Sequence, residues 1–222
     1  MKKFKYSEIT PEKIYKNRRS FIKSIGLGAS SLAISTIPFA NKSLANERDK
    51  LTSYKDITTY NNYYEFGTSK GDPYRNSQIF KTSPWDISIE GEVEKPIKLS
   101  MEEISEMFVS EERIYRLRCV EGWSMVIPWM GFSLSELLSK VNPTNKAKFV
   151  EFESVYDPAQ MKGQRYPVLN WPYNEGLRID EAMHPLTTVV TGLYGKKLPN
   201  QNGAPFRIFI PWKYGFKSAK AI

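Results

Sequence analysis

The sequence predicts an α+β domain with mixed β-sheets and short helices, and two kinds of pattern indicate it. Two capping boxes, each a serine with a glutamate three residues later, open short helices at Ser100 and Ser133. Five short runs have the period or the composition of strands, and they cover residues 85–91, 114–118, 149–155, 187–193 and 206–210. Strands and helices of this length fit one domain of about 180 residues.

Residues 1–45 have the pattern of a twin-arginine export signal. Arg18 and Arg19 precede Phe21 and a mildly apolar run, and residues 43–45 (Ser-Leu-Ala) form a small-x-small cleavage site. Asn17 stands where the usual pattern has Ser or Thr. The alternatives are an ordinary secretory peptide and a membrane anchor, but glycines and serines interrupt the run too often for a membrane helix. We therefore expect export to the periplasm by the twin-arginine machinery, with residues 46–222 as the functional domain.

The basic charge of the chain belongs mostly to this leader. The whole sequence has 32 Lys and Arg against 24 Asp and Glu, whereas residues 46–222 have 23 against 22. A domain with so little net charge lacks the electrostatic footprint of a nucleic-acid-binding protein. The sequence therefore argues against a role with nucleic acid.

Cys119 is the single cysteine, and it follows residues 114–118, which alternate as a strand. We expect it at the end of that strand, where a loop begins, with Tyr115 and Leu117 on the same face. One reading is a buried structural cysteine. The other is a single thiolate ligand to a metal that something else mainly holds. One Cys and one His cannot form a closed zinc or iron–sulfur site.

Two further segments have the composition of ligand-binding surfaces. Residues 60–67 are dense in Tyr and Asn, which suits either a packed aromatic segment or a wall for a flat polar ligand. Near the end, Arg207, Lys213, Lys217 and Lys220 surround a Gly-containing turn, which suits either a solvated basic loop or an anion cradle. Residues 46–60 look like a loose polar lead-in, and residues 157–175 like a long loop.

Several of these stretches together resemble one family, the catalytic subunits of periplasmic methionine-sulfoxide reductases. These are molybdopterin enzymes of the sulfite-oxidase fold family. The resemblance runs from the leader to Ile222, and the matching stretches are residues 60–67, 112–121, 123–129, 181–186, 201–205 and 211–217. The resemblance implies a sulfite-oxidase-like molybdopterin-binding domain that reduces methionine sulfoxide in exported proteins, with electrons from a haem-bearing membrane partner.

The resemblance also implies site residues. Cys119 would be the catalytic position and the protein ligand of molybdenum, in a molybdenum–molybdopterin cofactor. Ser154 stands where the family has a threonine. The positions that would contact the cofactor are Asn61, Tyr64, Glu65, Cys119, Ser154, Asn202, Arg207, Ser218, Ala219 and Lys220. Glu121 and His184 are candidate proton donors.

One departure keeps other functions open. The given sequence stops at Ile222, whereas family members continue, so we expect a domain that is truncated at its C-terminus. The alternatives are a sulfite-oxidase-like dehydrogenase and a non-catalytic remnant that binds pterin or a protein partner. A sulfite-binding site would need a strongly basic pocket at the metal, whereas a neutral sulfoxide would not.

The leader generates a prediction about export. Because twin-arginine signals are read by a receptor, replacing Arg18 and Arg19 with Lys should retain the protein in the cytoplasm. Cell fractionation with immunodetection measures this. Normal periplasmic accumulation of the double variant would show that the leader is an ordinary secretory one.

Overall fold

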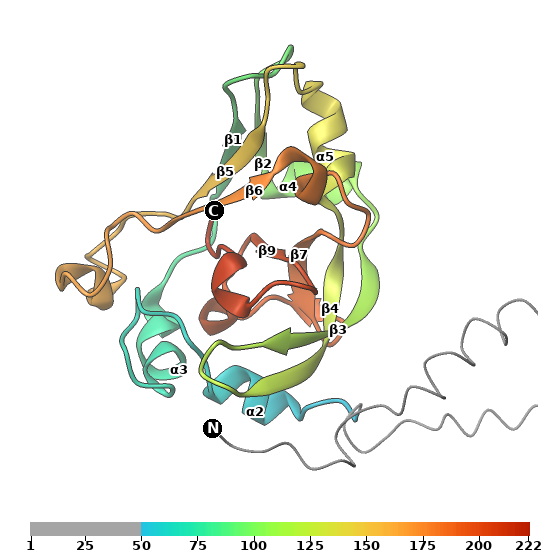
Figure 1. The fold of residues 1–222 in the computed structure, drawn as a ribbon. Coiled ribbons are helices and arrows are strands. Elements are labelled where there is room, and N and C mark those ends of the chain that lie inside the picture. Colours follow the sequence, from blue (N-terminus) through green and yellow to red (C-terminus); the bar gives the residue numbers. More distant parts are fainter. Residues whose placement is uncertain (1–49) are drawn as a thin grey trace, which may run out of the picture. The chain divides into compact units, whose positions relative to one another are not determined.

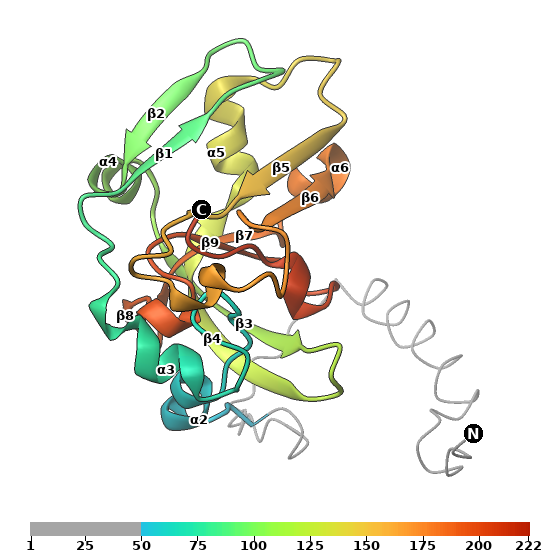
Figure 2. The ribbon, with the colours of Figure 1, turned by 90° about the vertical axis from the view of Figure 1, so that its left-hand side faces the viewer.

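A computed structural model describes residues 50–222, and the predicted leader lies outside these residues. The described domain is α+β, as predicted (Figures 1 and 2). The helices are α2 (Tyr54–Thr59), α3 (Asp72–Asn76), α4 (Met101–Met107), α5 (Leu134–Val141) and α6 (Ile179–Ala182). Turns of 3-10 helix are η3 (Ser77–Ile79), η4 (Lys162–Arg165), η5 (Asn200–Asn202) and η6 (Gly215–Lys217).

One five-stranded antiparallel sheet forms the centre of the domain. It runs in the order β3 (Glu111–Arg118), β4 (Ser124–Ser133), β7 (Thr188–Leu193) and β8 (Lys196–Lys197), and β9 (Arg207–Phe209) also pairs with β7. Two separate two-stranded ribbons lie beyond it in Figure 1. They are β1 (Asp86–Ile89) with β2 (Ile97–Ser100), and β5 (Phe149–Glu153) with β6 (Asn174–Arg178).

Residues 50–222 contain three apolar clusters, and the two larger ones hold these layers together. The larger core joins the ribbons to α4, α5 and one end of the sheet, through residues such as Leu99, Leu137, Phe152 and Ile208. The second core covers the other end of the sheet and contains Trp129 and Phe209. The second core also borders the cavity described below, so the packing of the sheet fixes one wall of that cavity.

Both capping boxes form as predicted. The Ser100 hydroxyl accepts from the Glu103 N–H at 3.1 Å, and the Glu103 carboxylate accepts from the Ser100 N–H at 2.8 Å. Ser133 and Glu136 form the second box at the start of α5. Each box satisfies backbone N–H groups that a helix start leaves open, which explains why these short helices begin where the sequence indicates.

The predicted polar lead-in is wrong for residues 54–59, which form α2. The Ser53 hydroxyl caps this helix by accepting from the Asp56 N–H at 3.1 Å. Ile57 is fully buried in the second core, and burial of a side chain of this size stabilises by roughly 1.5–3 kcal/mol. The burial of Ile57 therefore stabilises residues 54–59 as a helix, although their local sequence pattern predicts a helix only weakly.

Proline is rare inside strands, yet Pro128 lies inside β4, opposite Ile114 of β3. Its carbonyl accepts from the Tyr194 N–H, which lies on the β7 side. In an antiparallel strand the N–H and the carbonyl of one residue point to the same neighbouring strand, so the N–H that proline lacks would also point toward β7. It would lie just past the end of β7, and no hydrogen bond between β4 and β3 is lost.

The long loop after β5 runs back to the segment at residues 60–67. Residues 174 and 175 of the predicted loop belong instead to β6, and residues 162–165 form η4. The N–H of Gly163 donates to the carbonyl of Glu65 at 2.8 Å. A Cβ on Gly163 would lie 1.9 Å from the carbonyl oxygen of Tyr64, closer than any real contact. The absence of a side chain at Gly163 therefore sets the position of Tyr64 and Glu65.

This contact generates a stability prediction. Gly163→Ala must displace the backbone of Tyr64, so it should lower the free energy of unfolding by about 1–3 kcal/mol. Gly176→Ala is the matched control, because its nearest contact would be an ordinary 3.9 Å to the Val150 carbonyl. Urea titration of both variants measures the difference. Equal stability of the two variants would contradict the close packing at Gly163.

Candidate active site

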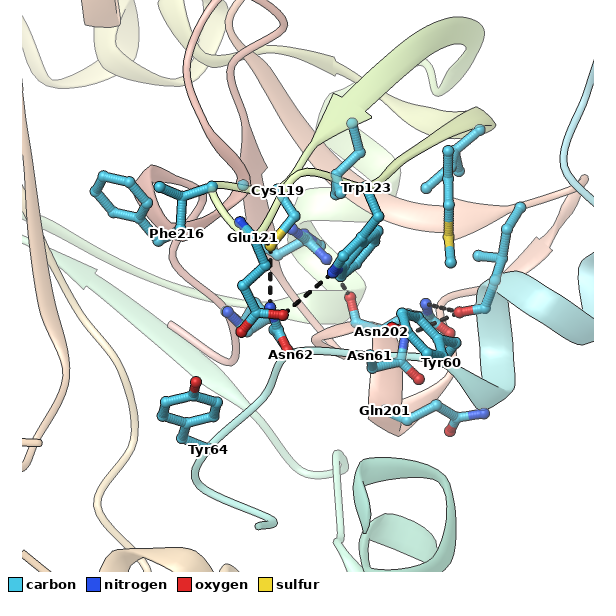
Figure 3. Close-up of a pocket in the computed structure, with 18 of the residues that line it drawn as sticks. Tyr60, Asn61, Asn62, Tyr64, Cys119, Glu121, Trp123, Gln201, Asn202 and Phe216 are labelled. Atoms are coloured by element: carbon cyan, nitrogen blue, oxygen red, sulfur yellow. Dashed lines mark hydrogen bonds between the residues drawn. The ribbon is translucent and has the colours of Figure 1, made fainter. Parts of the chain in front are cut away.

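A cavity of about 330 Å³ lies between five segments of the described chain (Figure 3). The segment after α2 forms one wall, and β3 and β4 with the turn between them form another. The rest comes from η5 with β9, from the segment that includes η6, and from the loop between η4 and β6. Among the lining residues are Asn61, Asn62, Tyr64, Glu65, Cys119, Glu121, Trp129, Asn202, Arg207 and Lys220.

Cys119 directly follows β3, so its predicted position at a strand end is confirmed. Its N–H donates to the Trp123 carbonyl at 2.9 Å, and its carbonyl accepts from the Gly122 N–H at 3.1 Å. Gly122 has φ +87°, a backbone conformation that favours glycine and that closes this turn. Cys119 is partly exposed and lines the cavity, which argues against the buried structural reading.

Two N–H groups point at the sulfur of Cys119. The Asn62 amide donates to Sγ at 3.1 Å, and the Glu121 backbone N–H approaches it at 3.4 Å (Figure 3). Donors of this kind stabilise negative charge on sulfur. The cavity therefore presents Cys119 as an electron-pair donor.

Glu121, beside the cysteine, is tied into an ion pair. Its carboxylate accepts from Lys70 at 2.8 Å and from the Trp123 indole N–H at 3.2 Å. The hydrogen bond from Lys70, then that from Trp123, lowers the pKa of Glu121. An ionised carboxylate in this setting is an orienting group rather than a proton donor.

His184, the other candidate proton donor, does not line this cavity. It is exposed, and its ring packs against Trp212 with 4.6 Å between the ring centres. Its Nδ1 accepts from the Leu186 N–H at 3.1 Å. This is the arrangement of a structural histidine.

Two cations lie deep in the cavity wall. Arg207 is buried, and its guanidinium stacks over Trp129 at 4.9 Å and donates to the Asn202 carbonyl at 2.7 Å. Within residues 50–222 it has no carboxylate within ion-pair distance. The Lys220 ammonium lies 4.9 Å from the centre of the Tyr63 ring. An antiparallel bridge between their backbones places these two residues side by side.

Burial shifts the pKa values of the two cations and of a neighbouring carboxyl group. It lowers the pKa of Arg207 to about 10 and that of Lys220 to about 8. Burial also raises the pKa of Glu65, the buried carboxyl group that lines the same cavity, although Lys220 acts in the opposite direction. Of the carboxylates near these two cations, Glu121 is already paired with Lys70 and Glu175 with Lys217, and the raised pKa of Glu65 favours its neutral form. The cavity has a charge imbalance that an anion would remove.

Unpartnered buried polar atoms show what else the cavity could hold. The side-chain nitrogens of Asn61 and Asn202 both donate to the Ile57 carbonyl, at 2.8 and 3.0 Å, and this leaves their Oδ1 atoms without a partner. Other buried side-chain atoms without a hydrogen bond are Asn62 Oδ1, Tyr63 Oη, Trp129 Nε1, Ser154 Oγ, Arg207 Nε and Ser218 Oγ. The open atoms of Asn61, Asn62, Trp129, Asn202 and Arg207 belong to residues that line the cavity, which indicates that the cavity binds a polar group.

These atoms fit molybdopterin, which has N–H groups on a flat ring and a phosphate. The amide oxygens can accept from the ring, and Arg207, Lys220 and the hydroxyls can hold the phosphate. No cluster of three or more His, Cys, Asp or Glu side chains that could hold a metal occurs in residues 50–222. A metal at Cys119 would therefore need most of its ligands from the cofactor.

The structure brings most of the predicted site residues together. Asn61, Tyr64, Glu65, Cys119, Asn202, Arg207 and Lys220 line the cavity. Ser154, Ser218 and Ala219 are buried but are not among the lining residues. Sequence reasoning gave no site role to Asn62 or Trp129, although both lie in stretches that carry the family resemblance.

Two lysines of the predicted anion cradle have other partners. Lys213 pairs with Glu181 at 2.6 Å, and Lys217 pairs with Glu175. Their inclusion in an anion cradle is therefore wrong, and the uncompensated charge belongs to Arg207 and Lys220. The sequence of the tail alone does not distinguish Lys213 and Lys217 from Arg207 and Lys220, because the acidic partners of the first two residues come from other parts of the sequence.

The lowered pKa of Lys220 generates a pH prediction. Between pH 8 and 10.5, the unfolded chain holds a proton on Lys220 that the folded, cofactor-free protein has largely lost. The free energy of unfolding should therefore rise with pH through this window, and Lys220→Met should lack this contribution. Urea titrations at several pH values measure both slopes. Parallel slopes for wild type and variant would show that Lys220 is not perturbed by burial.

Comparison with known proteins agrees with this geometry. Residues 74–222 match the family described as oxidoreductase molybdopterin binding domain. The sulfane dehydrogenase SoxCD structure from Paracoccus pantotrophus has a TM-score of 0.53 at 13% identity. The match covers 87% of this chain and 54% of that chain, and it shows a shared fold.

Curated relatives are much closer in sequence. The chain is 52% identical to the protein-methionine-sulfoxide reductase catalytic subunit MsrP of Xanthomonas axonopodis pv. citri, over 97% of this chain and 71% of the relative. The protein of the same name from Burkholderia mallei is 50% identical, over 97% of this chain and 70% of the relative. The chain therefore belongs to the family of protein-methionine-sulfoxide reductase catalytic subunits and carries an oxidoreductase molybdopterin-binding domain.

Proposed function

We propose that this protein is a molybdenum-dependent reductase that removes the oxygen of methionine sulfoxide in exported proteins. The observation that carries the proposal is one cavity with a thiol held by two N–H groups and two cations, Arg207 and Lys220, that form no ion pair within residues 50–222. The overall reaction adds two electrons and two protons to the sulfoxide and releases the thioether and water. The names of the related MsrP proteins support this reaction class.

In this proposal, Cys119 is the protein ligand of molybdenum, since a soft thiolate suits such a metal. Arg207, Lys220 and the segment at residues 218–220 hold the phosphate. Asn61, Tyr64, Glu65, Ser154 and Asn202 hold and orient the pterin. The bound cofactor supplies the two-electron chemistry, whereas the residues of this chain bind it, orient it and shape access to it.

The surroundings of Cys119 favour a neutral substrate over sulfite. Its hydrogen-bond donors are an amide and a backbone N–H, and the neighbouring charges of Glu121 and Lys70 compensate each other. An anionic substrate would gain from an uncompensated cation beside the thiol. A sulfoxide carries no net charge, so it fits this balanced environment better.

The cellular setting is part of the same proposal. The twin-arginine leader supports export to the periplasm, and the family resemblance supports a haem-bearing membrane partner as electron donor. In residues 50–222, no helix has the length and apolar character needed to cross a membrane.

The role of Cys119 can be tested directly. Wild-type protein should carry about one molybdenum per chain and reduce methionine sulfoxide, because the thiolate is a soft ligand. Cys119→Ser should lose the sulfur-to-metal absorption signal and most of this activity, since a hydroxyl is a poorer ligand. Met107→Ser, which removes an exposed sulfur far from the lining residues, is the control. Unchanged metal content and activity in Cys119→Ser would refute the assignment, and a loaded but inactive wild type would favour the non-catalytic remnant.

The role of Arg207 can be tested through cofactor retention. Each charge-assisted hydrogen bond is worth about 1.5–3 kcal/mol, so Arg207→Ala should weaken retention of the cofactor roughly ten- to a hundredfold. Arg207→Lys should lie between, because the charge stays and the planar fork is lost. Molybdenum and pterin are measured after matched purification. Arg178→Ala, which removes an exposed arginine paired with Asp180, should behave as wild type. Equal cofactor content in all four proteins would exclude a phosphate-binding role.

A further inference from the structure

Four exposed apolar side chains surround the mouth of the cavity. Tyr60, Val120, Leu169 and Phe216 all line the cavity, and they are 42%, 63%, 38% and 49% exposed. They come from four segments that are far apart in sequence. We call these four residues the apolar rim. In the view of Figure 3, Tyr60 and Phe216 lie on opposite sides of Cys119.

Core packing accounts for little of the apolar rim. None of its four members belongs to a hydrophobic core cluster or to the side chains that pack against one, although Tyr60 contacts the Trp123 ring and Phe216 stacks on Tyr214. Single exposed apolar residues are normal on protein surfaces, but a group of them around one opening usually marks a binding surface. Because the rim residues also line the cavity, the group that binds to the rim and the group that enters the cavity should belong to the same molecule.

The charged residues that directly follow two rim residues are paired within the protein. Glu121, which follows Val120, pairs with Lys70 at 2.8 Å. Lys217, which follows Phe216, pairs with Glu175. The nearby Arg118 donates to the Pro211 carbonyl. This chemistry fits an apolar, uncharged partner and disfavours a charged one.

The size of the cavity says where such a partner must lie. The cofactor, which the proposed function places between Arg207 and Cys119, would fill most of a cavity of about 330 Å³ and leave no room there for a polypeptide. The residues on either side of an oxidised methionine must therefore stay outside, at the mouth. There they would meet the four rim residues.

We propose that the apolar rim binds the residues that flank an oxidised methionine in a polypeptide, and that it selects sulfoxides with apolar neighbours. This inference rests on the proposed reduction of methionine sulfoxide. A sulfoxide is small and neutral, so the flanking residues supply contact area that the sulfoxide itself lacks. Tyr60 and Phe216 offer the largest rings for this contact.

Two short synthetic peptides test the proposal on the purified, cofactor-loaded protein. Both carry a central methionine sulfoxide, flanked on each side by leucines in one peptide and by serines in the other. Dissociation constants come from fluorescence anisotropy of labelled peptides, and turnover is measured with a chemical reductant. Each leucine that is buried adds apolar area, so the leucine peptide should bind at least about tenfold more tightly.

Variants then locate the preference on the surface. Phe216→Ser and Val120→Ser should each reduce the preference for the leucine peptide about three- to tenfold, by loss of apolar contact. Phe149→Ser and Val109→Ser are matched controls, because both residues are exposed and neither lines the cavity. Cofactor content and thermal unfolding, measured on every variant, show that each is loaded and folded.

The outcomes separate this inference from the proposed function. Equal affinity for both peptides, or rim variants that match the controls, would overturn the role of the rim. If no sulfoxide is reduced but rim-dependent peptide binding remains, the reductase proposal fails and the binding surface stands. In a third outcome, the rim variants bind both peptides as wild type does, and their turnover is slow only when the membrane electron donor replaces the chemical reductant. The rim then faces that donor, and our inference is wrong.

Discussion

The structure depends on one electrostatic constraint, the placement of the buried Arg207 beside the partly buried Lys220, with no ion pair for either within residues 50–222. Burying a cation is costly unless something compensates its charge. Within residues 50–222 the fold nevertheless holds both cations in place, through the pairing of Arg207 with Val190 of β7 and the bridge between Arg207 and Lys220. Gly203, with φ +100°, leaves room for both, since a Cβ there would lie 2.8 Å from the Lys220 side chain. Such an arrangement is stable when an anion such as a phosphate completes it.

The same sheet that holds the cations also holds the thiol. Cys119 follows the end of β3, whereas Arg207 opens β9, and β4 and β7 connect these two strands through continuous antiparallel pairing. The spacing between the sulfur and the anion site is therefore set by hydrogen-bonded strands rather than by a flexible loop. A cofactor that must reach both ends benefits from such a rigid frame, because less freedom is lost when it binds.

The features that the sequence predicted correctly depend on local chemistry. The two capping boxes, at Ser100 and Ser133, use atoms three residues apart, and the strand before Cys119 follows from its alternation. The features that it missed depend on distant partners. α2 forms because Ile57 packs in the second core, and Pro128 fits β4 because its missing N–H lies past the end of β7. The tail shows the same limit, since only the fold distinguishes the compensated Lys213 and Lys217 from the uncompensated Lys220.

The interior and the mouth of the cavity have opposite chemistry, and each matches what it would have to recognise. A cofactor with a phosphate can be selected by charge, and Arg207 and Lys220 provide that charge where water is largely excluded. A methionine sulfoxide has no net charge, so an ion pair cannot select it. Selection at the mouth must come from contact area, and the exposed side chains there are apolar. The compensation of Glu121 by Lys70 has the same consequence, because it keeps the surroundings of Cys119 neutral while a substrate approaches.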